Sequence, residues 1–397
     1  MFHHIPPFPG DPILTLNENF ASDPHPRKVN LSIGVYLDEQ GKLPVMQAVA
    51  QAKADLQATP YTHPYLPMEG LREYRMQAQQ MLFGGAAPQD GQTRIATVQT
   101  LGGSGALRIG GDFLKEWFPG ANIWVSGPTW DNHWGIFAAT GFKVSEYPYF
   151  SAQKNGIDFE AMLATLSKLP AGDVVVLHGC CHNPTGADLS EEQWRELAVL
   201  FKERGLVPFF DVAYQGFGRG IDEDAFAVRH FVEHNIPMLV ASSFSKNFAL
   251  YGERCGALHI VCKDGAEAST VLSQLKSTIR RNYSNPPAFG GRLVAGVLSN
   301  ATLRSQWENE LTAMRNRMAT MRASLHQALQ ARTPNRDFSH IARQTGMFSF
   351  TGLDLDTVRK VRKEFGIYVL DSGRLCIAAL TPNTVEYVAE SIATACN

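Results

Sequence analysis

Short runs of β-branched and aromatic residues recur along this chain, and stretches with helical spacing separate them. Strands that alternate with helices predict βαβ units, in which a mostly parallel sheet is covered by helices on both faces. The fold class expected is therefore α/β, with one large, mostly parallel mixed sheet. The runs that predict its strands cover residues 94–98, 122–126, 174–178, 207–210, 238–241 and 257–261. One helix between them has a clear start, because Ser190 and Gln193 form a capping-box pattern.

A second, smaller α+β domain is expected at the C-terminal end. Apolar residues keep helical spacing from about residue 299 to Leu329, which predicts a long helix that joins two domains. After Pro334, short strand patterns and helical patterns alternate again. The predicted limits are an N-terminal arm at 1–12, a large domain at 46–312, and a small domain formed by 13–45 and 313–397.

Composition narrows the class of function. Of the 397 residues, 36 are lysine or arginine and 38 are aspartate or glutamate, so no charge excess favours nucleic acid or an anionic membrane as a partner. No apolar run approaches the roughly 20 residues of a membrane span, and the N-terminus lacks the pattern of a signal peptide. We therefore expect a cytoplasmic protein that acts on a small molecule. The six cysteines have no metal-ligand spacing, so free thiols and no metal are expected.

Three polar residues follow three of the predicted strands. Asn183, Asp211 and Lys246 come after the runs that begin at Val174, Val207 and Met238. In an open α/β sheet, ligands bind beyond the carboxyl ends of the strands, so these side chains are expected to converge on one ligand.

The types of these residues indicate a pyridoxal phosphate site. A lysine can form a Schiff base with the cofactor, and a buried carboxylate such as Asp211 would keep the pyridine nitrogen protonated. Ser243, Ser245 and Arg254 can bind the phosphate, and Tyr214 can bind the phenolic oxygen. Each residue also has an ordinary interpretation: Lys246 as a surface group, Asp211 as a helix N-cap, Tyr214 as a core residue.

A glycine-rich run, 102–105, precedes a helical pattern, so Gly103 and Ser104 could hold a phosphate at the start of a helix. A tight turn is the alternative. A dinucleotide fingerprint is a weaker one, because Arg108 stands where the third glycine would be.

Four further residues are candidates that the local sequence leaves open. Trp130 can stack on a planar ring or lie in the core, and His133 alone is a weak signal. Arg280 and Arg374 can be surface charges, but their forked guanidinium groups suit two carboxylates of a dicarboxylic substrate.

Taken together, the motifs resemble those of a known family, the aspartate and aromatic amino acid aminotransferases of the class I branch, which are fold-type I pyridoxal phosphate enzymes. The resemblance extends almost from end to end. It rests on the segments 98–107, 128–133, 181–186, 211–217, 243–247 with 251–254, 284–287 and 346–349.

The resemblance implies a role for each candidate. Lys246 would form the internal aldimine and move the proton in a ping-pong transamination. Asp211 would bind the pyridine nitrogen with His133 behind it, and Trp130 would cover the ring. Asn183 and Tyr214 would bind the phenolic oxygen. The phosphate would be held by Gly103, Ser104, Ser243, Ser245 and Arg254.

The resemblance also implies a homodimer with shared active sites. Tyr65 would reach the phosphate of the neighbouring subunit, and Arg280 would bind the side-chain carboxylate of a dicarboxylic substrate there. Arg374 would hold the α-carboxylate, and Gly34 would belong to a segment that closes over the substrate.

The aromatic branch is favoured by the segments 65–70 and 99–104. The expected reaction is transfer of the amino group of tyrosine or phenylalanine, and of aspartate or glutamate, to 2-oxoglutarate. The alternative within the family is an aspartate aminotransferase with little aromatic activity. Other hypotheses are β-elimination or decarboxylation on the same scaffold, a non-catalytic cofactor-binding module, and a nicotinamide dehydrogenase.

Overall fold

The structure is a computed structural model, and it describes the chain except for residues 8–9, 59–61, 87–92 and 397. It divides into two compact units. The larger contains 44–183 and 187–316, and the smaller contains 1–43, 184–186 and 317–397. The domain limits predicted from the sequence stay predictions.

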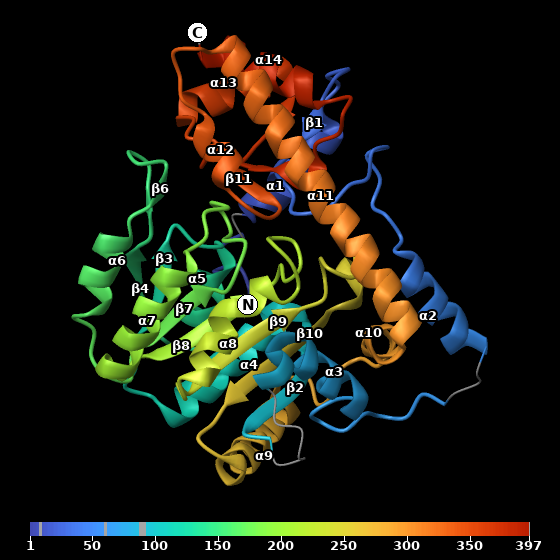
Figure 1. Cartoon of the computed structure of the whole chain (residues 1–397), viewed down its shortest axis with the longest axis vertical. Coiled ribbons are helices and arrows are strands. Elements are labelled where there is room, and N and C mark those ends of the chain that lie inside the picture. The colour runs from blue at the N-terminus through green and yellow to red at the C-terminus, as the bar shows by residue number, and fades with distance from the viewer. Residues whose placement is uncertain (8–9, 59–61, 87–92, 397) are drawn as a thin grey trace. The chain divides into compact units, whose positions relative to one another are not determined.

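A seven-stranded sheet forms the centre of the larger unit (Figure 1). Its order is β2-β10-β9-β8-β7-β3-β4, and only β10 runs against its neighbours. The prediction of a mostly parallel mixed sheet is therefore confirmed. The strands are β2 (Ile95–Leu101), β3 (Ile123–Gly127), β4 (Val144–Pro148), β7 (Val174–His178), β8 (Val207–Val212), β9 (Met238–Ser243) and β10 (Cys255–Val261).

Helices cover both faces of this sheet, as neighbouring residues of β8 demonstrate. The ring of Phe209 packs against Phe137 on one face, at 5.7 Å between centroids. The ring of Phe210 lies 5.1 Å from Phe231 on the other face. Side chains alternate along a strand, so a strand buried on both faces needs apolar residues at consecutive positions. This is why the run at 207–210 is continuously apolar.

The helices of the larger unit fill the connections between strands. They are α2 (Gln47–Ala58), α3 (Arg72–Phe83), α4 (Gly102–Trp117), α5 (Asn132–Ala139), α6 (Phe159–Leu166), α7 (Glu191–Arg204), α8 (Phe226–Glu233), α9 (Gly265–Asn282) and α10 (Phe289–Ser299). A short antiparallel pair, β5 (Phe150–Ser151) and β6 (Gly156–Ile157), lies between β4 and α6.

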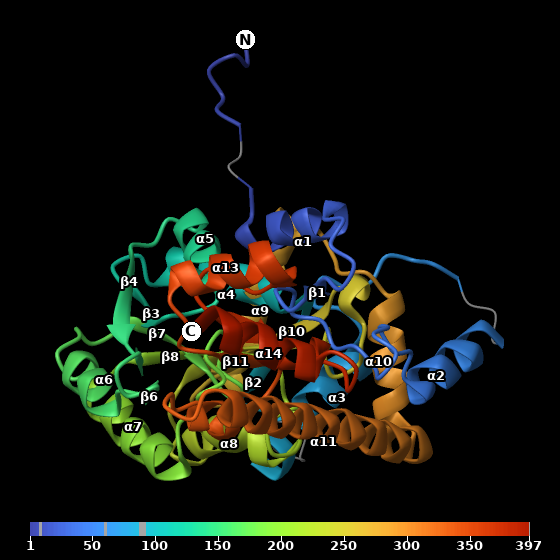
Figure 2. The same cartoon turned by 90° about the horizontal axis from the view of Figure 1, so that it is seen from above.

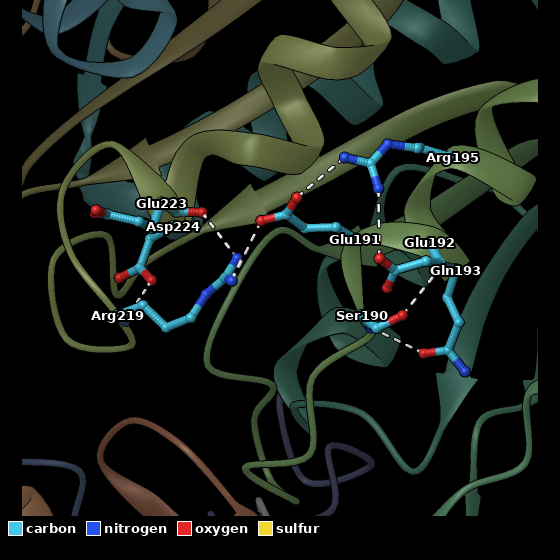
Figure 3. Close-up of polar contacts among 8 residues, drawn as sticks. All are labelled: Ser190, Glu191, Glu192, Gln193, Arg195, Arg219, Glu223 and Asp224. Carbon is cyan, nitrogen blue, oxygen red and sulfur yellow. Dashed lines mark hydrogen bonds and ion pairs between the residues drawn. The ribbon is translucent and has the colours of Figure 1, made fainter.

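The predicted capping box of α7 is present. Ser190 Oγ accepts a hydrogen bond from the backbone N–H of Gln193, and the Gln193 side chain accepts one from the N–H of Ser190 (Figure 3). The first turn of the same helix is tied to the loop after β8, because Glu191 forms an ion pair with Arg219. That loop is held from within by Asp224, which accepts the backbone N–H of Arg219 at 2.8 Å.

One long helix, α11 (Ala301–Arg332), contributes residues to both units and confirms the helix predicted from about residue 299 (Figures 1 and 2). In the smaller unit, β1 (Val29–Asn30) pairs in parallel with β12 (Ile367–Tyr368), and β11 (Phe348–Phe350) pairs in antiparallel with β13 (Arg374–Cys376). Its remaining helices are α1 (Pro12–Ser22), α12 (Ser339–Arg343), α13 (Leu355–Phe365) and α14 (Val385–Cys396), of which α13 and α14 pack together (Figure 2).

Two expectations from composition can be compared with the structure. All six cysteines are free thiols, as predicted, and five of them are buried. Among the residues that the structure describes, no helix combines the length and apolar character that crossing a membrane requires.

Candidate active site

The candidate residues of the larger unit gather at the edge of the sheet where β3, β7, β8 and β9 end. Asp211 lies within β8, one residue before its end, and Lys246 follows β9 by three residues. Asn183 follows β7 by five residues. The sequence-based expectation that these residues share one edge agrees with the observed strand order, because the four strands are parallel.

Asp211 forms a buried hydrogen bond with a histidine from a different element. Its Oδ2 lies 3.1 Å from His133 Nε2, and the two side chains are 7% and 0% exposed. The other ring nitrogen of His133 lies 2.8 Å from Thr129 Oγ1. With both ring nitrogens engaged, the imidazole is fixed in orientation, and Nε2 is the atom that donates to the carboxylate.

This environment keeps Asp211 ionised. Burial alone would raise the pKa of the carboxyl group, but the hydrogen bond from His133 and the charge of Lys246 outweigh it, so the pKa of Asp211 lies below its ordinary value. A buried carboxylate that stays charged is suited to face a cationic ring nitrogen.

Lys246 is half-buried, and its ammonium lies 5.1 Å from the centre of the Tyr214 ring. Burial disfavours the charged form and lowers the pKa of Lys246, Arg254 lowers it further, and Asp211 opposes the shift. A lysine with a lowered pKa has a larger fraction of neutral amine near pH 7, and this is the form that reacts with carbonyl groups.

Tyr214 and Asn183 lie together beside the lysine. Asn183 Nδ2 donates to the Tyr214 hydroxyl at 3.4 Å, and both residues are about 95% buried. Trp130 is half-buried two residues before α5, with its ring packed edge-on against His133 at 5.4 Å between centroids. Tyr214 is buried, as its ordinary interpretation as a core residue predicts, but its hydroxyl contacts another candidate residue, Asn183.

Several potential phosphate donors lie near the N-terminus of α4. Gly103 and Ser104 belong to its first turn, where backbone N–H groups have no partner within the helix. Ser243 and Ser245 are each 5% exposed, and the Ser245 N–H donates to Ser243 Oγ at 3.2 Å. A Cβ on Gly103 would come within 3.3 Å of Ser243 Cβ, so the helix start and the serine loop are in direct contact.

Arg254 reaches the same place because β10 is antiparallel to β2 and β9. Cys255 pairs with Leu101, and Gly256 pairs with Ser243, so the start of β10 lies where β2 and β9 end. Gly102 donates its N–H to the Arg254 carbonyl at 3.0 Å. It has a positive φ of 69°, and a Cβ there would approach Arg254 Nη2 to 2.7 Å. A glycine is needed at this point both for the backbone and for the guanidinium.

Two candidates of the larger unit lie outside this cluster. Tyr65 is 93% exposed. Arg280 is exposed near the end of α9, where it donates to Ser284 Oγ. Within the chain that the structure describes, neither side chain forms a hydrogen bond or ion pair with Asp211 or Lys246.

Gly34 and Arg374 lie in the smaller unit and share a neighbour. Arg374 is 97% buried, and its guanidinium stacks 4.3 Å from the centre of the Phe348 ring and donates to the Ser32 carbonyl. A Cβ on Gly34 would come within 2.8 Å of the same ring. Phe348 therefore brings Gly34 and Arg374 together in this unit.

Sequence reasoning missed several residues that touch the candidates. Thr129 and Phe348 lie within the family motifs but received no role, and His178 was recognised only as the end of a strand. His178 lies 5.2 Å from the His133 ring, and burial lowers its pKa to about 3, so it is neutral. The alternation of side chains along the strands offered a signal for His178. It pairs with Asp211 in the neighbouring strand, and paired residues point to the same face of the sheet.

The structure thus places a lysine and a buried, ionised aspartate at the edge of an α/β sheet where ligands bind in this class of fold. The family model for aminotransferase class I and II matches residues 26–392. The chain belongs to this family.

Particular relatives narrow the comparison. The chain is 51% identical to an aromatic-amino-acid aminotransferase of Escherichia coli over 394 residues, which are 99% of each chain. It is 48% identical to an aspartate aminotransferase of Salmonella typhi, again over 99% of each chain. Among solved structures, an aromatic-amino-acid aminotransferase of Burkholderia pseudomallei, covalently bound to pyridoxal phosphate, superposes with a TM-score of 0.98 at 47% identity and full coverage of both chains.

Proposed function

We propose that this aminotransferase transfers the α-amino group of tyrosine or phenylalanine, and of aspartate or glutamate, to 2-oxoglutarate. Its cofactor is pyridoxal 5′-phosphate. The observation that carries the proposal is the buried hydrogen bond between His133 and Asp211 at the same sheet edge as Lys246. A relative named for aromatic amino acids at 51% identity supports the substrate class. An aspartate aminotransferase with little aromatic activity is the second candidate, supported by the relative of that name at 48% identity.

The donor set fits the cofactor. The N-terminus of α4 with Ser104, Ser243, Ser245 and Arg254 offers N–H, hydroxyl and guanidinium groups, which are the donors that bind phosphate. Gly102 leaves space that a Cβ would fill beside the guanidinium. Lys246 is assigned the Schiff base, Asp211 the pyridine nitrogen, and Asn183 with Tyr214 the phenolic oxygen.

When bound, pyridoxal phosphate withdraws electrons from the substrate Cα and so stabilises a carbanion. Asp211, ionised and held by His133, would keep the pyridine nitrogen protonated, which is the state that withdraws electrons most strongly. Lys246, as a neutral amine, would accept the proton from the substrate Cα and deliver it to C4′ of the cofactor. Trp130 would cover the ring of the cofactor and limit access of water.

Substrate carboxylates are assigned to the arginines. Arg374 is fixed by Ser32 and Phe348 and would orient the α-carboxylate, so that the Cα–H bond is the one aligned for cleavage. Gly34, on the same Phe348 ring, belongs to the segment that closes over the substrate.

The proposed enzyme is a homodimer with shared active sites. Tyr65 and Arg280 are exposed in one chain, and each is assigned to the site of the partner: the tyrosine to the phosphate, the arginine to the second carboxylate of a dicarboxylic substrate. Six free thiols are typical of a reducing compartment, and this supports a cytoplasmic location.

The visible spectrum of the purified protein tests the proposal. We expect a cofactor band that phenylalanine, added without oxo acid, abolishes at low concentration. Lys246→Ala should remove both the band and this response, whereas Lys202→Ala, on the exposed face of α7, should leave them unchanged. A response to aspartate alone would favour the second candidate, and no response to either amino acid would exclude transamination.

A further inference from the structure

Gln99 connects two segments that are distant in sequence, residues 65–71 and 280–291. Each segment carries a residue that is assigned to the active site of the partner subunit. Gln99 is about 99% buried and lies on β2, one of the two edge strands of the seven-stranded sheet. Gln99 Oε1 accepts the backbone N–H of Leu71 at 3.0 Å, and Gln99 Nε2 donates to the carbonyl of Pro287 at 2.8 Å. One amide group therefore satisfies a donor before α3 and an acceptor before α10.

The backbone of Gln99 reaches the same two segments. Its N–H donates to the Glu69 carbonyl at 2.9 Å, and its carbonyl accepts the Tyr283 hydroxyl at 3.3 Å. These bonds lie on the free side of β2, where no further strand pairs with it in the described sheet. Each segment is thus held to Gln99 by one backbone bond and one side-chain bond.

Glycines allow this close approach. A Cβ on Gly70 would lie 2.3 Å from Gln99 Cβ, and one on Gly291 would lie 2.7 Å from Gln99 Nε2. Real Cβ atoms do not come this near to other heavy atoms, so both segments pack directly on the glutamine and their positions depend on its shape.

The two segments contain Tyr65 and Arg280. Tyr65 precedes the Glu69 contact by four residues, and Arg280 precedes the Tyr283 contact by three. Both side chains are exposed within the single chain, so their own burial does not fix where they point. Their placement depends on the backbone segments that Gln99 holds.

We propose that Gln99 is a positioning residue that sets the Tyr65 and Arg280 segments together for donation to the partner's active site. The inference rests on the proposed function, in which the cofactor phosphate and the second substrate carboxylate are contacted from the other subunit. β2 leads directly into the start of α4, so the residue that aligns the donated segments lies three positions before Gly102, the first residue of the proposed phosphate-binding turn.

Binding of two unreactive acids to the holoenzyme tests the proposal. Maleate has two carboxylates, the second of which is assigned to Arg280, whereas 3-phenylpropionate has one carboxylate and no group for Arg280 to bind. Gln99→Met keeps the length of the side chain and removes both side-chain hydrogen bonds, to Leu71 and Pro287, while the two backbone bonds can remain. We expect it to weaken maleate binding about tenfold, as Arg280→Ala should, and to change 3-phenylpropionate binding less than about twofold. Isothermal titration calorimetry measures both.

A matched control separates positioning from general loss of stability. Gln79 donates to Thr93 Oγ1 at 2.8 Å and holds neither donated segment, so Gln79→Met should not discriminate between the two acids. Tyr283→Phe, which removes only the bond to the Gln99 carbonyl, should produce a smaller change with the same selectivity. It keeps the test valid if Gln99→Met does not fold.

Two outcomes would overturn the proposal. One is that Gln99→Met and Tyr283→Phe weaken the binding of both acids equally. The other is that neither variant weakens binding, while Arg280→Ala weakens the binding of maleate selectively. If Arg280→Ala itself fails to discriminate, the assignment of Arg280 in the proposed function is wrong. The proposal for Gln99 is then tested on the segment that contains Tyr65. Gln99→Met should accelerate loss of the cofactor as Tyr65→Phe does, and an unchanged rate of loss would contradict the proposal.

Discussion

The Nε2 atom of His133 lies 3.1 Å from Oδ2 of Asp211, and both side chains are almost fully withdrawn from water. The histidine comes from α5 and the aspartate from β8, 78 residues further along the chain. A charged carboxylate in such a place is stable only when it is paired. We therefore expect its function to depend on the charge and not only on the hydrogen bond.

Asp211→Asn removes the charge and keeps the shape. The reaction with phenylalanine should slow by at least about 10²-fold, because the neutral amide no longer stabilises a protonated pyridine nitrogen. Asp211→Glu should retain part of the rate. Stopped-flow absorbance of the half-reaction measures both, and Asp173→Asn is the control. Asp173 is a buried aspartate that binds Asn122 and Trp124 away from the candidate site, and its loss should affect stability alone.

Gly102→Ala should weaken binding of the cofactor. The added Cβ would come within 2.7 Å of Arg254 Nη2 and displace the guanidinium from the phosphate position. Gly172→Ala is the control, since Gly172 also has a positive φ, of 87°, but a Cβ added there would meet no atom within 4 Å. Both variants carry the same type of backbone strain, so only Gly102→Ala should lose its visible band after prolonged dialysis. Equal retention by the two proteins would refute the phosphate assignment of Arg254.

Ala249→Gly should stabilise the protein. Ala249 has a φ of +52°, a left-handed conformation that costs a residue with a Cβ about 1–2 kcal/mol relative to glycine. We expect the free energy of unfolding in urea to rise by about 1 kcal/mol. Ala198→Gly, in the interior of α7, should lower it by about the same amount. A loss of stability at both positions would mean that Ala249 does not adopt this conformation.

His259 makes stability depend on pH. Burial lowers its pKa to about 3, from an ordinary value of 6.5. The unfolded chain therefore takes up a proton as the pH falls below about 6.5, while the folded protein takes it up only near pH 3. This contribution to stability is fully present above pH 6.5 and is lost at about 1.4 kcal/mol per pH unit between these two values.

Replacing the histidine isolates this contribution. His259→Gln can still bond to Thr97 and Ser242, which lie 3.0 and 3.1 Å from the ring nitrogens. Its free energy of unfolding should fall less steeply between pH 6.5 and 5 than that of the unaltered protein, by about 1.4 kcal/mol per pH unit. Urea unfolding at both pH values measures the slopes, and parallel slopes would contradict the neutral state of His259.

Most of the sheet could be predicted from the sequence because its central strands are apolar on both faces. The strand that was missed, β4, is an edge strand with only Tyr147 buried and with Glu146 and Pro148 exposed. Its pattern resembles a loop, since an edge strand needs an apolar side chain on one face only.

The residues of the site also divide into those that the sequence could predict and those that it could not. Lys246, Asp211 and Asn183 could be predicted to meet because strand ends in a parallel sheet share an edge. His133 had no local signal, and its place became evident from family motifs and then from its bond to Asp211. The role inferred for Gln99 depends on contacts with residues 28 and 188 positions away, and hydrophobic periodicity contains no information about such pairs.

The single reversed strand of the sheet also affects how the site is connected. A parallel successor to β9 would need a connection that crosses a face of the sheet, but β10 is antiparallel, so the chain returns beside β9 through residues 244–254. Lys246 and Arg254, the assigned attachment points of the cofactor's aldehyde and phosphate ends, are therefore only eight positions apart on one short loop. The length of that loop limits how far apart the two ends of the ligand can be held. An insertion between residues 247 and 253 would alter both anchors together, whereas one in the connection between β7 and β8 would leave their spacing intact.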